Sequence, residues 1–167
     1  MLFNIEKVSW LDNNRIQTVR ETLVFLKQEY PDFFAWFNAK VIPGLEDNSR
    51  QIYIARPMSS PNSVAGIMIL KDEPDEKKIS TLCVMEQYRS YGLGSKFINL
   101  AIETLHSLTP IITVSELHRN EFEPLLKKYS FKHFKEYFAY YRDNVSEHSY
   151  NGYLTSSQKK HDMVSAS

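Results

Sequence analysis

The segment Arg89-Ser90-Tyr91-Gly92-Leu93-Gly94 lies between a strand-like run, Ile79 to Val84, and a helix-like run, Ser95 to Leu108. The hydrophobic period changes from two residues to about 3.6 residues at this place. Two of the 5 glycines in the 167-residue chain fall here, where they let the backbone approach a ligand closely. The first turn of a helix has amide groups without intrahelical partners and a partial positive charge. The segment therefore predicts a strand, a turn and a helix whose N-terminus binds phosphate.

Length and composition limit the remaining possibilities. We predict one domain over residues 1–155 and a disordered polar tail over residues 156–167. The 20 basic and 20 acidic side chains give no net charge, which argues against a nucleic-acid partner held by bulk charge. The single cysteine, Cys83, excludes a disulfide framework and favours a reducing, cytoplasmic location. No signal peptide or membrane-spanning run is recognisable.

Hydrophobic periodicity predicts the order β-α-α-β-β-β-α-β-α-β-β, which is typical of an α/β protein with a mixed sheet and helices on both faces. Asp12 or Asn13 is expected to cap a first helix that runs through Tyr30, before Pro31 interrupts it. The charged segment 71–78 is predicted to be a solvated loop. The predicted strands are 2–9, 51–56, 63–70, 79–84, 111–114, 131–142 and 149–154, and the later helices are 33–42, 95–108 and 121–128.

The run from Val84 to Gly94 resembles the acetyl-CoA signature of the GCN5-related N-acetyltransferase (GNAT) superfamily, V-x-x-x-x-[QR]-x-x-G-x-[GA]. Val84, Arg89, Gly92 and Gly94 occupy its constrained positions. The segment 125–131 is similar to the family's "LYEKLGF" segment at the end of the last helix. The resemblance implies a sheet that splays open between the fourth and fifth strands, with the pantetheine arm of acetyl-CoA in the split.

The same resemblance implies the residues that contact acetyl-CoA, the expected co-substrate. The backbone of the strand would polarise the acetyl carbonyl, and the amides of the turn would bind the pyrophosphate. The implied cofactor-binding residues are Leu82, Cys83, Val84, Arg89, Ser90, Tyr91, Gly92, Leu93, Gly94, Ser95 and Asn120. Phe33, Phe34, Trp36 and Phe37 either border the acceptor site, as the resemblance implies, or belong to the core. No metal site is expected from the scattered histidines and the single cysteine.

Acetyl transfer to an amine needs a neutral amine, a polarised thioester carbonyl and a proton for the leaving thiolate. Candidate bases are Glu76, Glu86, Glu116 and His118. Many members of the family place a tyrosine at the position of Leu126, and Tyr129 could replace it only if the end of the helix is rearranged. The general acid is thus the part of the mechanism that the sequence supports least.

The resemblance implies an N-acetyltransferase of class EC 2.3.1 that transfers acetyl directly, in a ternary complex, to a primary amine of a small molecule or a protein. An acyl-CoA sensor without catalysis is the alternative that Leu126 favours. A toxin that acetylates aminoacyl-tRNA would need a basic patch, for which Lys127, Lys128, Lys132 and Lys135 are available. The chain could be a monomer or a homodimer, with Phe134, Phe138 and Tyr140 either in the interface or in the core.

Overall fold

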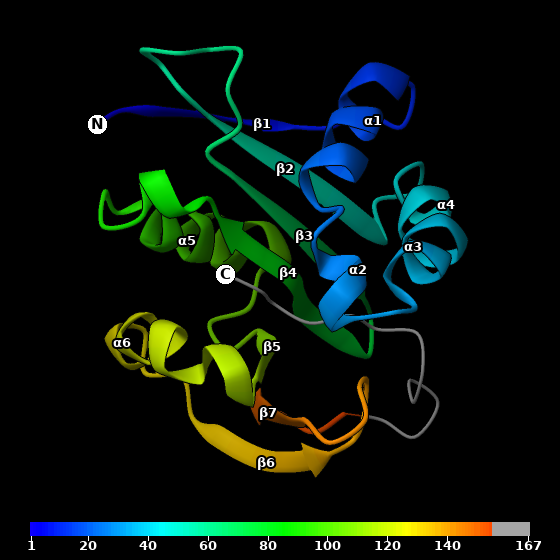
Figure 1. Cartoon of the computed structure of the whole chain (residues 1–167), viewed down its shortest axis with the longest axis vertical. Coiled ribbons are helices and arrows are strands. Elements are labelled where there is room, and N and C mark those ends of the chain that lie inside the picture. Colours follow the sequence, from blue (N-terminus) through cyan, green and yellow to red (C-terminus); the bar gives the residue numbers. More distant parts are fainter. Residues whose placement is uncertain (155–167) are drawn as a thin grey trace.

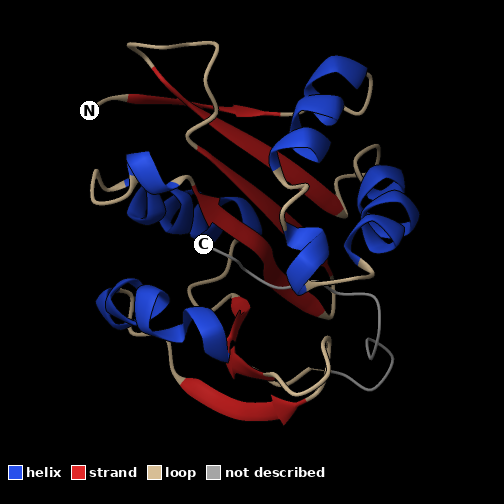
Figure 2. Cartoon of the chain, viewed as in Figure 1, coloured by secondary structure: helices blue, strands red, loops and turns tan. Residues whose placement is uncertain are grey.

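A mixed sheet of seven strands forms the centre of the molecule, in the order β1-β2-β3-β4-β5-β7-β6 (Figures 1 and 2). The structure, a computed structural model, describes residues 1–154. The predicted tail, 156–167, lies outside the described residues. The strands are β1 (Phe3–Lys7), β2 (Arg50–Pro57), β3 (Gly66–Glu73), β4 (Glu76–Val84), β5 (Ile111–Ser115), β6 (His133–Phe138) and β7 (Ser146–Tyr150). Only β4 and β5 pair in parallel among these neighbours; the others are antiparallel.

Helices cover both faces of this sheet, as the predicted fold class requires. The first face carries α1 (Asn13–Thr22), α2 (Leu26–Glu29), α3 (Phe33–Trp36), the π-helical turn η1 (Phe37–Val41) and α4 (Ile42–Gly44). The second carries α5 (Leu93–Leu105) and α6 (Arg119–Lys128). Short 3₁₀ turns, η2 (Glu86–Tyr88) and η3 (Glu116–His118), follow β4 and β5. Within residues 1–154, no helix combines the length and the apolar character needed to cross a membrane.

The sheet splits between β4 and β5, which confirms the splay that the resemblance implies. These strands pair only at Lys78 with Ile111 and at Ile79 with Ile112. The next residue, Ser80, is an extra residue on β4, because Leu70 of β3 pairs with Ile79 while Ile69 pairs with Thr81. Such a β-bulge bends its strand and increases the local twist. Beyond the bulge, β4 pairs with β3 alone in the described structure, which leaves one edge of residues 80–84 open to the split.

The charged segment 71–78 corrects the prediction of a loop. It forms the ends of β3 and β4 and the tight turn between them. Charges of opposite sign meet across this hairpin, with Lys71 Nζ 3.2 Å from Glu76 Oε1 and an ion pair between Lys77 and Asp72. Cross-strand pairs of opposite charge stabilise a sheet. A dense run of charges was therefore no evidence against strands here.

Several other boundaries differ from the prediction by a few residues, as the first helix and the last strand illustrate. The first helix is interrupted at Leu23, and α2 starts at Leu26, since the exposed Val24 and its neighbour Phe25 are poor helix formers. The last strand, β7, begins at Ser146, three residues before the predicted start. Phe134 and Phe138 are exposed on the edge strand β6, so the alternative that they belong to the core is wrong.

Candidate active site

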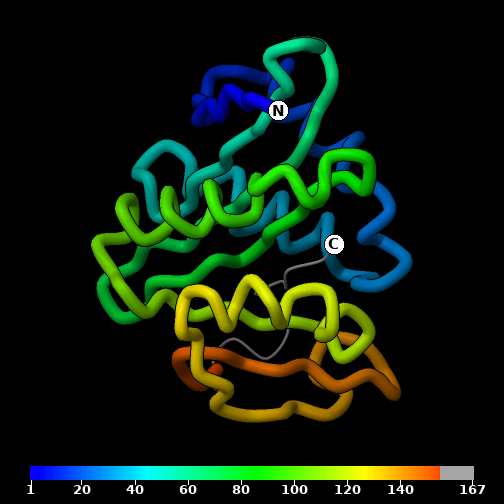
Figure 3. The backbone as a smooth tube through the Cα atoms, turned by 90° about the vertical axis from the view of Figure 1, so that its left-hand side faces the viewer, coloured from blue at the N-terminus to red at the C-terminus, as the bar shows by residue number. Residues whose placement is uncertain are grey.

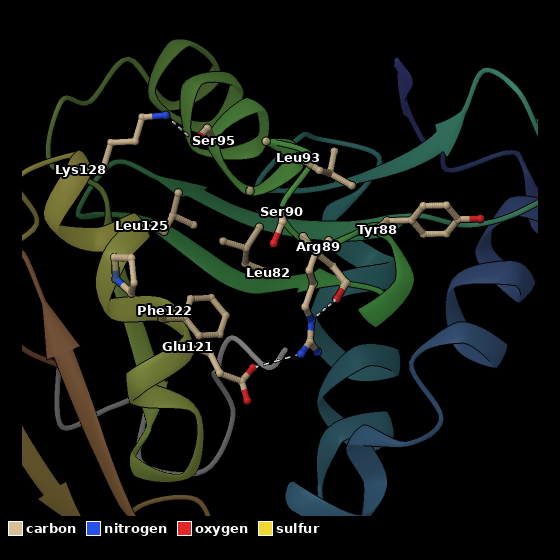
Figure 4. Close-up of a pocket in the computed structure, with 14 residues that line it drawn as sticks. Leu82, Tyr88, Arg89, Ser90, Leu93, Ser95, Glu121, Phe122, Leu125 and Lys128 are labelled. Atoms are coloured by element: carbon tan, nitrogen blue, oxygen red, sulfur yellow. Dashed lines mark hydrogen bonds and ion pairs between the residues drawn. The ribbon is translucent and has the colours of Figure 1, made fainter. Parts of the chain in front are cut away.

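A cavity of about 470 Å³ lies between α5 and α6, beside the split in the sheet. The two helices run side by side in Figure 3, in green and yellow. The cavity is lined by the end of β4, the turn after it, the start of α5 and one face of α6, as Figure 4 shows. The lining residues are Leu82, Val84, Tyr88, Arg89, Ser90, Gly92, Leu93, Gly94, Ser95, Glu121, Phe122, Pro124, Leu125 and Lys128.

The N-terminus of α5 opens into this cavity. Gly92 is the N-cap residue and has a left-handed backbone, with φ of 80°, and Ser90 also has a positive φ of 67°. The first intrahelical bond runs from the Lys96 amide to the Gly92 carbonyl oxygen. No side chain among the described residues caps the helix. The amides of residues 93–95 therefore have no intrahelical acceptor and present donors and the positive helix end to a ligand.

Two contacts join α6 to this helix N-terminus. The hydroxyl of Tyr129 donates to the Ser95 carbonyl oxygen at 3.0 Å, and Lys128 Nζ donates to Ser95 Oγ at 2.8 Å. The absence of a side chain at Gly94 lets the helices approach, because a Cβ there would lie 3.1 Å from Leu125 Cδ2. The width of the cavity is thus fixed by residues that line it or directly follow it.

A chain of charged side chains crosses from α2 to the cavity. Glu29 of α2 accepts from His118 Nε2 at 2.9 Å, and His118 Nδ1 lies 3.6 Å from Glu121 Oε1. Glu121 Oε2 lies 3.5 Å from an Arg89 guanidinium nitrogen, and Arg89 Nε donates to the Val84 carbonyl oxygen at 3.3 Å (Figure 4). The imidazole of His118 therefore lies between two carboxylates, one of which lines the cavity.

The other predicted catalytic residues lie elsewhere. Glu76 begins β4, whereas Val84 at the other end lines the cavity; eight residues of strand separate them by roughly 26 Å. Glu76 is buried against Lys71 and does not line the cavity. Glu116 accepts a hydrogen bond from His148 and lies outside the cavity lining. The Tyr129 hydroxyl proton is committed to the Ser95 carbonyl oxygen, so this tyrosine holds two helices together rather than acting as the acid.

The aromatic cluster in α3 and η1 belongs to the core. Phe33, Trp36 and Phe37 are buried and pack against one another. Only Phe34 is partly exposed among the four aromatic residues. The burial of Phe33, Trp36 and Phe37 agrees with the alternative that the cluster belongs to the core, and none of the four residues lines the cavity between α5 and α6.

Most of the implied cofactor residues surround the cavity, with three exceptions. The Cys83 side chain packs on the α1 to α4 face, where burial raises the pKa of its thiol to about 12. Tyr91 is 49% exposed and lines a different surface hollow with Met1 and Leu2. Asn120 is exposed and its side chain does not line the cavity.

Sequence reasoning missed the contribution of α6. Glu121, Phe122, Pro124, Leu125 and Lys128 line the cavity. Their spacing of three to four residues marks one helical face, which is the signal that could have identified them. Among the described residues, no cluster of three or more His, Cys, Asp or Glu side chains is arranged to hold a metal ion.

A second missed residue, Glu147 of β7, lies on the other face of the sheet. Its side chain is buried, and Oε1 accepts a hydrogen bond from the Tyr30 hydroxyl at 3.3 Å. Burial raises the pKa of the Glu147 carboxyl to about 8. A strand-end glutamate within a polar sequence gave no signal of this environment.

Solved structures with the same fold are known, although no protein-family model and no curated protein sequence matches the chain. A protein from Desulfovibrio desulfuricans assigned to the GNAT family of acetyltransferases superposes with a TM-score of 0.67 at 12% identity, over 89% of this chain and 97% of that one. The NatC complex bound to Gag peptide and CoA gives 0.66 at 16% identity, over 90% and 97%.

A third structure, spermidine N-acetyltransferase from Vibrio cholerae in complex with CoA and spermine, gives a TM-score of 0.60 at 9% identity, over 94% of this chain and 97% of that one. These likenesses extend over nearly the whole of each chain. At such identities they establish the fold, and they confirm the fold class that the motif between Val84 and Gly94 implies.

Proposed function

We propose that this chain, which has the fold of the GCN5-related N-acetyltransferases, is an acetyl-CoA-dependent N-acetyltransferase that acts on a primary amine of a small molecule or a protein. The observation that carries the proposal is the uncapped N-terminus of α5, which opens into a cavity beside the split in the sheet. Helix N-termini of this kind bind phosphate groups.

The diphosphate of acetyl-CoA would be held by main-chain donors at residues 93–95. Lys128 lies at the same helix end through its bond to Ser95 and would add a positive charge. Arg89 also lines the cavity but already faces Glu121, so its contribution is partly neutralised before the ligand arrives. The left-handed residues Ser90 and Gly92 shape the turn that leads the backbone around the phosphates.

The pantetheine arm would lie along the open edge of β4. On the side of the split, no strand among residues 1–154 pairs with the backbone of residues 80–84, and Leu82, Phe122 and Leu125 provide apolar walls. An amide of this edge that faces the thioester would polarise its carbonyl group, as oxyanion-hole donors do. The same edge would thus position and activate the acetyl group.

His118 is our candidate for the proton donor to the leaving thiolate. It lies between Glu29 and Glu121, and Glu121 lines the cavity. Imidazole is a common proton donor and acceptor in proteins, and the two carboxylates hold this ring in place. This assignment fills the role left open by Leu126, which is buried and has no acidic group.

The buried Leu126 also keeps the second candidate, a CoA-binding sensor without turnover, open to test. The proposed enzyme should bind CoA in calorimetry and release free thiol from acetyl-CoA with some amine in a panel of spermidine, a peptide with a free N-terminus and a lysine peptide. Binding without any turnover would support the sensor, and acetylation confined to aminoacyl-tRNA would support the toxin. Absence of CoA binding would contradict all three.

Two adjacent lysines provide a matched test of the site. Lys128→Ala removes the charge at the helix N-terminus and should weaken CoA binding about tenfold. Lys127→Ala removes the same charge one residue away, where the side chain points to Glu123 and lies outside the cavity lining. It should leave the affinity within about twofold. Equal effects of the two substitutions would contradict the proposed phosphate site.

A further inference from the structure

Glu147 is positioned across the split from the open edge of β4. Ile79 of β4 pairs with Ile112 of β5, and Ser80 is the extra residue on β4. If the strands are followed from this pair and Ser80 is left out of the count, Cys83 is level with Ser115 of β5. Ser115 in turn pairs with Glu147 of β7. Glu147 is therefore level with the part of β4 that would bind the thioester, two strands away across the split.

The carboxylate faces the side of the sheet opposite to the cavity. Cys83 packs in the core of the α1 to α4 face, and Glu147 contacts Tyr30 at the end of α2 on that same face. The cavity, in contrast, lies on the α5 and α6 face. A thioester that reaches the split from the cavity could thus be met from the other face by a second substrate that passes Glu147.

The surroundings of Glu147 leave one carboxylate oxygen unused. The side chain is 1% exposed, and Oε2 has no hydrogen-bond partner in the described structure, whereas Oε1 accepts from Tyr30. A buried acceptor without a partner costs about 1–3 kcal/mol, and natural proteins keep few of them. A cationic ligand with N–H groups would supply the hydrogen bond that Oε2 lacks.

Titratable and polar groups from the neighbouring elements surround Glu147. Burial raises the pKa of its carboxyl and dominates; the Tyr30 hydroxyl and the charge of Lys78 lower this pKa, and Glu29 raises it. Ser115 of β5 and Tyr137 of β6 are the strand neighbours that pair with Glu147, and Tyr141, in the turn after β6, contacts Tyr30.

We propose that Glu147 receives the ammonium group of the acceptor and removes its proton, while the Tyr30 hydroxyl orients the carboxylate. The inference rests on the proposed function and adds the acceptor class: an aliphatic primary amine, protonated before it binds. An aliphatic ammonium with pKa near that of lysine, ~10.4, is neutral in only about one molecule in a thousand at neutral pH. A buried carboxylate beside the thioester lowers this barrier, because it accepts the proton at the place where the amine reacts.

The proton and electron pairs balance in this step. Glu147 Oε2 takes one proton from the ammonium, and the freed nitrogen lone pair attacks the thioester carbon. The C–N bond forms and the C–S bond breaks, so the thiolate leaves with the bonding pair. The thiolate takes a proton from His118, the second proton of the attacking nitrogen passes through solvent to restore His118, and Glu147 releases its proton to solvent.

The turn between β6 and β7 lies beside this site. Tyr141 packs edge-on against Tyr30, with 6.2 Å between ring centres, and Tyr140 packs against Tyr141. The rings of this turn are therefore part of the surroundings of the Tyr30 and Glu147 pair.

The test observes Glu147 itself in the protein loaded with CoA. Carbon-13 NMR of glutamate carboxyl groups, with Glu147→Gln for assignment, should show a signal that titrates near pH 8. Saturating n-butylammonium, or a tripeptide with a free N-terminus, should lower this midpoint by about one pH unit, because a bound cation favours the carboxylate. The neutral analogue n-butanol should leave it unchanged. A midpoint that responds to neither amine would overturn the proposal.

Controls separate this inference from the proposed function. Tyr30→Phe removes a bond to the carboxylate and should raise the midpoint, whereas Glu136→Gln, an exposed carboxylate on neighbouring β6, should leave it unchanged. Glu147→Gln should still bind CoA with wild-type affinity in calorimetry. Loss of CoA binding in the wild type would refute the proposed function; wild-type CoA binding with an amine-insensitive Glu147 would refute only the present inference.

Discussion

The Tyr129 hydroxyl donates a hydrogen bond of 3.0 Å to the main-chain carbonyl oxygen of Ser95 and so connects the end of α6 to the first turn of α5. Both helices contribute walls to the cavity, and Lys128 contacts Ser95 beside this bond. Sequence similarity suggests Tyr129 as a displaced catalytic acid, whereas this hydrogen bond favours a structural role for it.

Tyr129→Phe should lower the free energy of unfolding by about 1 kcal/mol, the usual net value of one hydrogen bond. It should weaken CoA binding several-fold, because the two walls of the cavity are no longer tied at this point. The turnover number at saturating acetyl-CoA and its pH profile should be unchanged. Thermal unfolding, calorimetry and steady-state kinetics measure the three effects, with the exposed Tyr153→Phe as control. A collapse of turnover at all acetyl-CoA concentrations would restore the catalytic role.

The loss of stability caused by substitutions at Gly92 should depend on backbone strain rather than on side-chain volume. Its φ is 80°, and a Cβ built there meets no atom within 4 Å. Gly92→Val should therefore destabilise the fold by more than about 1 kcal/mol and weaken CoA binding, while Gly92→Asn, which tolerates left-handed backbone, should cost much less. Denaturant unfolding and calorimetry of the two variants provide the check. Equal losses for Asn and Val would contradict this explanation.

Glu121→Gln should strengthen CoA binding by about threefold at low salt. Glu121 places a negative charge on the cavity wall and faces Arg89 at 3.5 Å, so its neutralisation removes repulsion from the diphosphate and leaves the guanidinium available to it. The gain should shrink as salt increases, because both side chains are partly exposed. Calorimetry at two ionic strengths measures the effect; Glu123→Gln, on the same helix but outside the cavity lining, is the control. Weaker binding would show that Glu121 contacts the ligand favourably.

The burial of Glu147 should make the stability of the protein depend on pH. Its pKa is about 8 in the folded protein and 4.5 without the fold, so the folded state binds more protons than the unfolded state between these values. Stability should accordingly fall as pH rises from about 4.5 to 8, by up to about 5 kcal/mol from this group. Glu147→Gln should remove this part of the decline and be the more stable protein at pH 8. Thermal unfolding across this range tests it, and parallel curves for the two proteins would contradict it.

Gly66→Ala should destabilise the sheet beside the site. A Cβ at Gly66 would lie 2.7 Å from the Cys83 carbonyl oxygen and 2.9 Å from Phe97 Cε2, and the carbonyl belongs to backbone that cannot move aside alone. We expect a loss of about 1–3 kcal/mol, typical of overpacking. Gly94→Ala, whose Cβ meets only the flexible end of Leu125, should cost less. Chemical denaturation of the pair measures the difference, and the reverse order would be inconsistent with the packing.

Particular elements show why some expectations succeeded. The strand, turn and helix around Gly92 were recognisable because local backbone chemistry places glycine, a change of period and a helix start in a fixed sequence order. The strands of the charged hairpin 71–78 cannot be read from a linear pattern, because their stability comes from ion pairs across β3 and β4, such as Lys71 with Glu76. Glu76 lies at the end of β4 that is far from the cavity, and only the folded chain shows this distance.

The sequence by itself determined the motif at Gly92 and Gly94, the alternation of strands and helices, and hence the fold, since these depend on interactions between near neighbours in the chain. The tertiary structure alone decided which side chains from distant segments meet: the face of α6 against the start of α5, His118 between Glu29 and Glu121, and Glu147 beneath Tyr30. Burial and the charge of its neighbours set the proton affinity of a carboxylate, and both are properties of the packed molecule rather than of the residue's place in the chain.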